Sequence, residues 1–240
     1  MENIISVFDL SFGYDSKRKV LENINFQLKK GESVGLVGAN GVGKSTLLRI
    51  LVGLNTGFQG DVMVNNIPLE KKNLKTIRKN VGYVFQDADS QLFMSTVFDD
   101  VAFAPRNYGM SEAEVNEKTM EALKVVHIEQ LKDKQIYKLS GGEKKLASIA
   151  TILSTEPDVI LMDEPSVALD PKNRRNLINI LNRLNQAKII ASHDLNMIMD
   201  TCERTILLSD GKIIKDGNTK EILLDKELME ESGLELPLGY

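Results

Sequence analysis

The stretch Val34-Gly35-Leu36-Val37-Gly38-Ala39-Asn40-Gly41-Val42-Gly43-Lys44-Ser45 decides the fold. Its first four residues form a short apolar run without alternation, which is typical of a strand buried on both faces of a parallel sheet. Its last eight residues match the pattern G-x-x-x-x-G-K-[ST], and an amphipathic helix follows from Ser45 to about Leu54. A glycine-rich loop between a buried strand and a helix predicts an α/β domain that binds a phosphate group.

Similar apolar runs at 159–162 and 189–191 predict further buried parallel strands. Residues 5–12 also have a strand pattern, and hairpin turns are expected at Asn65-Asn66 and Asp210-Gly211. We therefore expect an antiparallel β layer beside the parallel sheet.

The middle of the chain has helical patterns instead. Ser111 begins a helix with Glu114 three residues later, which is a capping box. We expect a single domain over residues 1–240, in which 88–155 form an inserted helical subdomain. The nucleotide-binding core and β layer are then 1–87 and 156–215, and 216–240 form a C-terminal helical tail.

The composition narrows the class of protein. The 240 residues are 42% hydrophobic with a net charge of -4, so a large core is possible and no nucleic-acid partner is expected. Cys202 is the one cysteine, which excludes an intrachain disulfide and agrees with a reducing compartment. The first residues do not resemble a signal peptide, and no apolar run approaches the roughly 20 residues of a membrane-spanning helix. Any role in transport would require other chains to cross the membrane.

The glycine-rich loop has the chemistry of a phosphate site. Its glycines allow backbone N–H groups to turn toward phosphate oxygens at a helix start. Lys44 places a positive charge on the β- and γ-phosphates, and the Ser45 hydroxyl is available to Mg²⁺. The alternative is a glycine-rich turn at a strand end. We predict nucleotide contacts from Gly38, Ala39, Asn40, Gly41, Val42, Gly43, Lys44, Ser45 and Thr46.

Two adjacent carboxylates, Asp163 and Glu164, end the apolar run 159–162. Ligands bind at the carboxyl ends of strands in an α/β sheet, so Asp163 is placed to hold Mg²⁺ through water. Glu164 can then accept a proton from the attacking water. An Asp-Glu pair alone is a common surface feature, but its position after a buried strand supports a role in the site.

A second glycine-containing helix start follows at Ser140-Gly141-Gly142-Glu143, where Ser140 and Glu143 form another capping box. Bare backbone N–H groups at this positive helix end make a second anion site. An ordinary helix start is the alternative interpretation. One nucleotide bridged between two subunits would explain two such sites far apart in one chain.

These motifs together resemble those of ABC transporter ATPases over nearly the whole chain. The resemblance implies a RecA-like P-loop NTPase fold with ATP and Mg²⁺ as ligands. Residues 38–45 resemble the Walker A motif, 139–143 the LSGGQ signature, 159–164 the Walker B motif and 166–170 the D-loop. Gln86 resembles the Q-loop glutamine, His193 the switch histidine and Tyr14 the aromatic residue that stacks on adenine.

The resemblance assigns a role to each site residue. Glu164, His193, Lys44 and Gln86 are expected to be catalytic, and Ser45, Gln86 and Asp163 to hold Mg²⁺. Tyr14 and residues 38–46 bind ATP, while Ser140, Gly141 and Gly142 close on the ATP of a second ATPase subunit. Three of these residues also have a purely structural interpretation. Gln86 could be a surface amide, His193 a histidine at a strand end, and Tyr14 or its neighbour Phe12 a packing residue.

Two residues depart from the family pattern. Glu143 replaces the usual signature glutamine, and its carboxylate would be unfavourable near a γ-phosphate. Capping the Ser140 N–H or pairing with nearby lysines would remove that conflict. Ala168 stands where many relatives have glycine. Neither change alters a catalytic group, so an active ATPase is expected.

The segment from Gln86 to Asn107 is similar to that of energy-coupling factor (ECF) ATPases, and the tail 232–237 to the cobalt or nickel branch. This implies a peripheral subunit on the cytoplasmic face of the cell membrane that energises uptake of a transition metal ion. A transmembrane coupling protein would contact residues 87–107. Vitamin uptake, a soluble non-transport ABC ATPase and a nucleotide-binding regulator without turnover are the alternatives. Homodimer and heterodimer both remain open.

Overall fold

The computed structural model describes residues 2–15 and 18–239. The larger sheet has the strand order β10 (Lys212–Asn218), β9 (Arg204–Ser209), β3 (Ser33–Val37), β8 (Ala187–Ala191), β7 (Val159–Asp163) and β6 (Val81–Val84). All neighbours are parallel except β10, which is antiparallel to β9. The smaller sheet is antiparallel, in the order β2 (Leu21–Lys29), β1 (Asn3–Phe12), β4 (Gln59–Val64) and β5 (Ile67–Pro68). The predicted parallel sheet and antiparallel layer are both confirmed.

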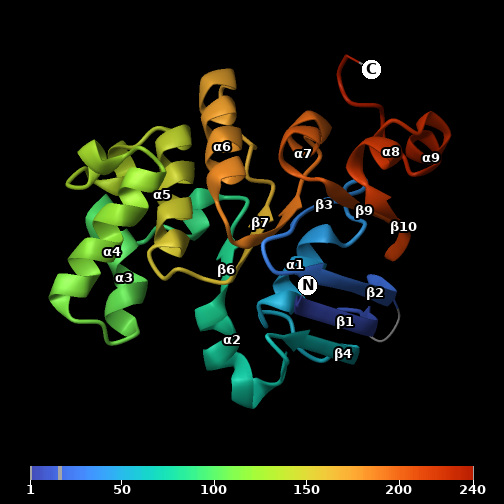
Figure 1. Ribbon diagram of the computed structural model, residues 1–240, viewed down its shortest axis with the longest axis horizontal. Helices are drawn as coiled ribbons and strands as arrows, with labels where there is room; N and C mark the ends of the chain where they lie inside the picture. Colours follow the sequence, from blue (N-terminus) through green and yellow to red (C-terminus); the bar gives the residue numbers. More distant parts are fainter. Residues whose placement is uncertain (1, 16–17, 240) are drawn as a thin grey trace.

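The helices cover both faces of the larger sheet (Figure 1). They are α1 (Lys44–Leu51), α2 (Leu74–Asn80), α3 (Val97–Asn107), α4 (Glu112–Val125), α5 (Gly141–Leu153), α6 (Pro171–Arg183), α7 (Leu195–Thr201), α8 (Thr219–Leu223) and α9 (Lys226–Glu231). Short 3-10 turns are η1 (Lys71–Asn73), η2 (Ala88–Ser90), η3 (Glu129–Leu131) and η4 (Ile136–Lys138). Within the described ranges, no helix is both long and apolar enough to cross a membrane.

The central strands are apolar without alternation because both of their faces are buried. In β7, Leu161 packs with the core that contains α1 and the antiparallel layer, whereas its neighbour Met162 packs with the core that contains α5, α6 and α7. Helix α1 therefore lies between the two sheets. It is shorter than expected because Gly53, in the left-handed region at φ 70°, turns the chain soon after Leu51.

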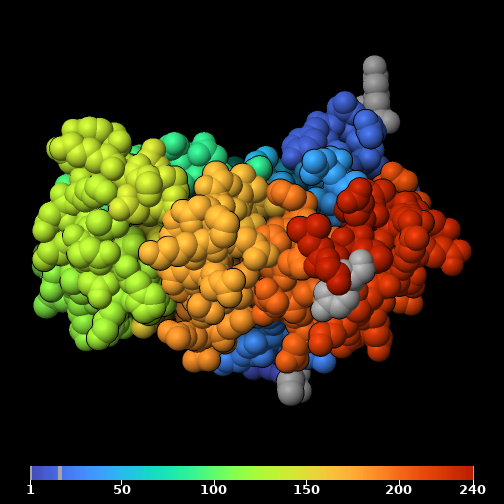
Figure 2. Space-filling model, turned by 90° about the horizontal axis from the view of Figure 1, so that it is seen from above, coloured from blue at the N-terminus to red at the C-terminus, as the bar shows by residue number. Residues whose placement is uncertain are grey.

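Helices α3, α4 and α5 form a lobe at one end of the molecule, which Figure 2 shows from above in green and yellow. These helices lie within 88–155, where the helical subdomain was expected. The boundary expected before residue 216 falls inside a strand, since β10 continues to Asn218. The Asp216 carboxylate pairs with Arg204 on β9 (2.6 Å), and Asn218 caps α8. The helical part of the tail begins at Thr219.

Candidate active site

Four loops that carry predicted site residues leave neighbouring parallel strands at one sheet edge. Leu36 of β3 and Asp163 of β7 both pair with Ala191 of β8, and Val84 of β6 pairs with Met162. The strands therefore end at nearly the same level, and the loops that follow them meet. This carboxyl edge is where α/β sheets bind ligands.

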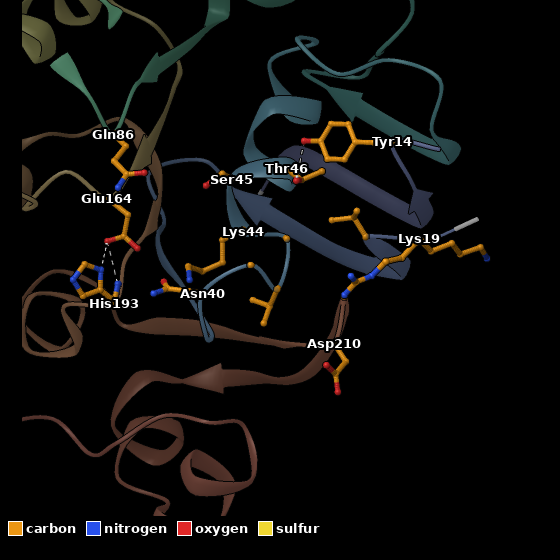
Figure 3. A pocket seen from close by; sticks show the side chains of 16 residues that line it. Tyr14, Lys19, Asn40, Lys44, Ser45, Thr46, Gln86, Glu164, His193 and Asp210 are labelled. Carbon is orange, nitrogen blue, oxygen red and sulfur yellow. Dashed lines mark hydrogen bonds and ion pairs between the residues drawn. The ribbon is translucent and has the colours of Figure 1, made fainter. Parts of the chain in front are cut away.

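The loops enclose a pocket of about 700 Å³ (Figure 3). Predicted site residues line most of it: Tyr14, Asn40, Gly41, Val42, Gly43, Lys44, Ser45, Thr46, Gln86, Glu164 and His193. Arg18, Lys19, Val20, Asp210 and Gly211 complete the wall. Residues from loops more than 100 positions apart and from the first turn of α1 thus face one cavity large enough for a nucleotide-sized ligand.

The phosphate loop is wound tightly around the side chain of Lys44. Gly43 has φ 109°, and a Cβ there would come within 2.7 Å of Leu21 Cδ2, so only glycine fits without displacement. The Lys44 ammonium donates hydrogen bonds to the carbonyls of Gly38 (2.6 Å) and Ala39 (3.2 Å). Burial lowers the pKa of Lys44, which Glu164 and Asp163 partly oppose. A positive charge therefore stands at the centre of the loop, beside the first turn of α1.

The Asp163 carboxylate is buried and held on both oxygens. The Ser45 hydroxyl donates to Oδ1 (2.9 Å) and the Tyr83 hydroxyl donates to Oδ2 (3.0 Å). Burial and the negative charge of Asp163 raise the pKa of Tyr83, so Tyr83 remains a donor. These contacts fix the carboxylate beside the first residues of α1.

Ser45 and Asp163 are oxygen ligands of the kind that Mg²⁺ prefers. No group of three or more His, Cys, Asp or Glu side chains that could hold a metal ion occurs in the described part of the chain. The two oxygen groups, Ser45 and Asp163, could hold a cation that takes its other ligands from phosphate oxygens and water. That is the usual way in which proteins bind Mg²⁺ with nucleotides.

Glu164 directly follows Asp163 and turns away from it, with φ 48° in the left-handed region. Its N–H bonds the Ala191 carbonyl (2.8 Å), which anchors it to the end of β8. Its Oε2 accepts from the Ser192 hydroxyl and the His193 N–H, each at 3.2 Å, and lies 2.8 Å from His193 Nδ1. The carboxylate is thus nearly buried at the pocket wall, with an exposed imidazole against it.

Gln86 leaves β6 with its side chain in the pocket, next to Glu164 in Figure 3. Tyr14 lies at the other end of the pocket. Its hydroxyl is 3.2 Å from Thr46 Oγ1, and its ring meets Phe12 edge-on with centroids 5.1 Å apart. Tyr14 is 63% exposed and Phe12 only 8%, so Tyr14 has the free ring surface that stacking on a base requires.

The structure does not bring Ser140, Gly141 and Gly142 to this pocket. Gly141 lines a second pocket, of about 440 Å³, between residues 85–90 (the Gln86 segment) and α5. The predicted capping box is confirmed: Ser140 Oγ accepts the Glu143 N–H (3.3 Å), and Glu143 Oε2 accepts the Ser140 N–H (2.7 Å). The Lys134 ammonium contacts both Glu143 oxygens at 3.1 Å. The unusual glutamate is therefore fully engaged within its own helix start and loop.

Several residues of this site were not predicted from the sequence. Ser192 adjoins the predicted His193, and this adjacency was a usable signal. Tyr83 lies on a buried strand, where an aromatic residue indicates only packing. Asp210 and Gly211 were predicted as a hairpin turn, which they are, but not as part of the pocket wall.

Comparison with known proteins shows the family to which this chain belongs. The sequence pattern of the ABC transporter family matches residues 21–167. An ABC transporter ATP-binding protein of Geobacter sulfurreducens is 47% identical over 99% of this chain and 95% of its own length. The energy-coupling factor transporter ATP-binding protein EcfA of Methanocaldococcus jannaschii is 41% identical over 98% of this chain and 86% of its own.

Among solved structures, cbiO1 from Clostridium perfringens, described as part of the ABC transporter complex cbiONQ, superposes with a TM-score of 0.86. It is 35% identical, over 96% of this chain and 94% of its own. The expected fold class, a P-loop α/β core with an antiparallel layer and a helical subdomain, is confirmed. The chain belongs to the ABC transporter family, as one of its ATP-binding and ATP-hydrolysing subunits.

Proposed function

We propose that this chain is the ATPase subunit of an ECF-type importer that energises uptake of cobalt or nickel through a separate membrane protein. The observation that carries the proposal is the segment after β6. It begins with Gln86 in the nucleotide pocket and leads, within 20 residues, to an exposed aromatic pair on the helical lobe. One short segment thus connects the site of hydrolysis to a surface suited to a partner.

In the proposed reaction, ATP stacks its adenine on Tyr14 and places its phosphates in the loop 38–46. Ser45, Gln86 and Asp163 would hold Mg²⁺, which would supply positive charge to neutralise the phosphates. Lys44, already surrounded by carbonyls, exchanges them for phosphate oxygens, and this exchange favours its charged form.

Glu164 accepts a proton from the attacking water through its carboxylate, while His193 holds the γ-phosphate end. The two side chains already touch through Oε2 and Nδ1, so little reorganisation precedes the chemical step. Glu164 is buried against the end of β8, which excludes bulk water from one side of it.

A second ATPase subunit completes the site. Ser140, Gly141 and Gly142 form an anion-binding helix start that does not line this chain's own pocket. A Cβ on Gly142 would lie 2.6 Å from Asn173 Nδ2, so a larger residue there would have to displace the Asn173 side chain. We propose that these groups close on the γ-phosphate of the partner's ATP, in a homodimer or with a related subunit.

The membrane partner is proposed to dock on the face formed by Phe93 and Phe103. These rings meet edge-on with centroids 4.7 Å apart, and they are 65% and 39% exposed. Both lie within residues 87–107, where the coupling protein is expected. An exposed aromatic pair of this kind suits contact with an apolar helix end of the partner. The chain would then sit on the cytoplasmic face of the membrane.

The choice of a metal ion as cargo rests on the resemblance of residues 232–237 to the cobalt or nickel branch of ECF ATPases, and vitamin uptake by an ECF importer is the alternative. A non-transport ABC ATPase is the less favoured second alternative, because it gives no role to the Phe93–Phe103 face.

Uptake assays in the native host test the proposal. The gene is deleted and the strain is complemented with the wild-type chain or with Glu164→Gln. We expect deletion to abolish uptake of radiolabelled cobalt or nickel, and only the wild-type chain to restore it. Loss of vitamin uptake instead would support the alternative cargo. Unchanged uptake of metals and vitamins would contradict the importer function.

A further inference from the structure

Lys145 is a buried charged residue for which the proposed reaction gives no role. It lies on α5, five residues after Ser140, and is only 3% exposed. Its ammonium donates to the backbone carbonyls of Phe85 (2.9 Å) and Gln86 (2.7 Å). Burial of a charge is costly unless its donors are satisfied. These two carbonyls, together with the negative charges of Asp87 and Asp163, offset its desolvation.

Gln91 forms a second link between the same two segments. Its amide nitrogen donates to the Ser148 carbonyl (2.7 Å) and to Thr151 Oγ1 (2.8 Å), both on α5. Its amide oxygen accepts the N–H of Phe85 (3.1 Å). Both backbone polar groups of Phe85 are therefore bound by side chains that lie on α5 or are fastened to it.

A third contact, between Lys144 and Asp89 (2.6 Å), is of a different kind. The Asp89 side chain is 63% exposed, so solvent screens the pair and it contributes little. Lys144 thus offers a matched control for Lys145, because the two are adjacent lysines on one helix. Lys144 forms an exposed ion pair, whereas Lys145 donates buried hydrogen bonds to the carbonyls of Phe85 and Gln86.

The side chain and the backbone carbonyl of Gln86 face different parts of the molecule. Its side chain lines the nucleotide pocket, and its carbonyl faces the Lys145 ammonium. We propose that Lys145 is a positioning residue that fixes the Gln86 side chain in the pocket and makes it move with the signature helix α5. Lys145 itself does not line the nucleotide pocket. The inference rests on the proposed catalytic role of Gln86.

Two functions are therefore linked within the first half of α5. Five residues of helix span about 7.5 Å. The anion-binding start at Ser140 and the Lys145 side chain therefore belong to one short, rigid stretch of helix. A shift of the helix start, when it closes on a partner's nucleotide, reaches Gln86 through hydrogen bonds without a flexible connection.

A double-mutant cycle tests the inference on the full-length chain, with Lys145→Met and Gln86→Ala alone and together. We expect Lys145→Met to lower kcat by roughly 10- to 100-fold, the range for displaced positioning groups, with the KM for ATP little changed. In the Gln86→Ala background the same change should lower kcat by less than about twofold, because the two residues act as a unit.

Two further variants separate positioning from folding. Lys145→Arg retains donors for both carbonyls and should recover much of the lost kcat, whereas the control Lys144→Met should leave kcat within about twofold. Thermal unfolding is measured for every variant. If Lys145→Met does not fold, Lys145→Gln takes its place in the cycle, because its shorter side chain cannot reach both carbonyls.

The outcomes are distinguishable. Equal relative losses of kcat from Lys145→Met in both backgrounds would overturn the inference and leave the role of Gln86 standing. So would a Lys145→Met variant with wild-type kcat. If Gln86→Ala alone has no effect, the proposed role of Gln86 fails, and the positioning role of Lys145 fails with it.

Discussion

His193 Nδ1 lies 2.8 Å from Glu164 Oε2, and the two side chains differ sharply in exposure: 61% for the imidazole and 9% for the carboxylate. The contact exists because β7 and β8 are adjacent and parallel, so the residues that follow them emerge side by side. Ser192 and the His193 N–H bind the same carboxylate oxygen. Three contacts from the residues that follow β8 therefore hold the carboxylate in one orientation, which suits its proposed role as the base.

Glu164→Gln is expected to abolish steady-state ATP turnover, with a loss of at least about 10²-fold, because an amide cannot accept the proton of the attacking water. The amide oxygen can still accept from Ser192 and the His193 N–H, so the fold and ATP binding should persist. Phosphate release measures the turnover. Size-exclusion chromatography with ATP should show a trapped dimer.

The matched control is Glu143→Gln, the same chemical change at the signature helix start. An amide oxygen can still cap the Ser140 N–H, and only the pair with Lys134 is lost. We expect turnover within about twofold of wild type and a stability loss below about 1 kcal/mol. Substantial turnover by Glu164→Gln would exclude Glu164 as the base, and a large loss in Glu143→Gln would mean that the glutamate contacts nucleotide.

Tyr83→Phe is expected to raise the Mg²⁺ concentration needed for half-maximal ATPase activity. The change removes the donor to Asp163 Oδ2 and leaves that oxygen buried without its partner, at a cost of roughly 1–3 kcal/mol. Ser45→Ala should raise the requirement further, because it also removes a proposed ligand. A Mg²⁺ titration of ATP turnover compares the variants, and identical half-maximal concentrations for Tyr83→Phe and wild type would contradict a role for Tyr83.

Acid should destabilise the protein through Asp194. Burial works to raise the pKa of this carboxyl, but hydrogen bonds from Arg174 and the Met197 N–H outweigh it, so its pKa in the fold is lowered from 3.8. A lowered pKa means that Asp194 contributes stability above its ordinary pKa and loses that contribution as the pH falls through the folded value.

The variant Asp194→Asn should therefore be less stable at pH 7, by roughly 2 kcal/mol for hydrogen bonds to a charged group. Its Tm should also fall less steeply than that of wild type between pH 5 and pH 2. Asp61→Asn, an exposed carboxyl-to-amide change on β4, serves as the control. Parallel Tm curves for wild type and Asp194→Asn would rule out this group as a source of acid sensitivity.

The strands and helix starts could be predicted because they depend on local patterns. The apolar run before Gly38, the capping box at Ser140 and the strand before Asp163 each have a signature within a few residues. The contacts that hold the site together have no such local signature. Tyr83 reaches Asp163 across 80 positions and Lys145 reaches Phe85 across 60, and a buried tyrosine or a helical lysine has the same local pattern whether or not it has such a partner.

The end of β10 was misplaced for a related reason. The segment Asp216-Gly217-Asn218 contains residues that are poor strand formers, which indicates a strand end before it. The Arg204–Asp216 ion pair across β9 and β10 continues the strand pairing through this segment. A tertiary contact of this kind outweighs the local preference.

The last prediction concerns the exposed aromatic pair. Phe93→Asp should abolish metal uptake and membrane association in cells while the isolated subunit keeps its ATPase activity within about twofold, because Phe93 is 65% exposed and distant substitutions act independently. Phe8→Asp, an exposed aromatic on β1 in the antiparallel layer, should leave both properties intact. Membrane fractionation and uptake are measured together with turnover of the purified chains. If Phe93→Asp supports normal uptake, the partner docks elsewhere; if it lowers turnover of the isolated subunit, the pair serves the helical lobe rather than a membrane protein.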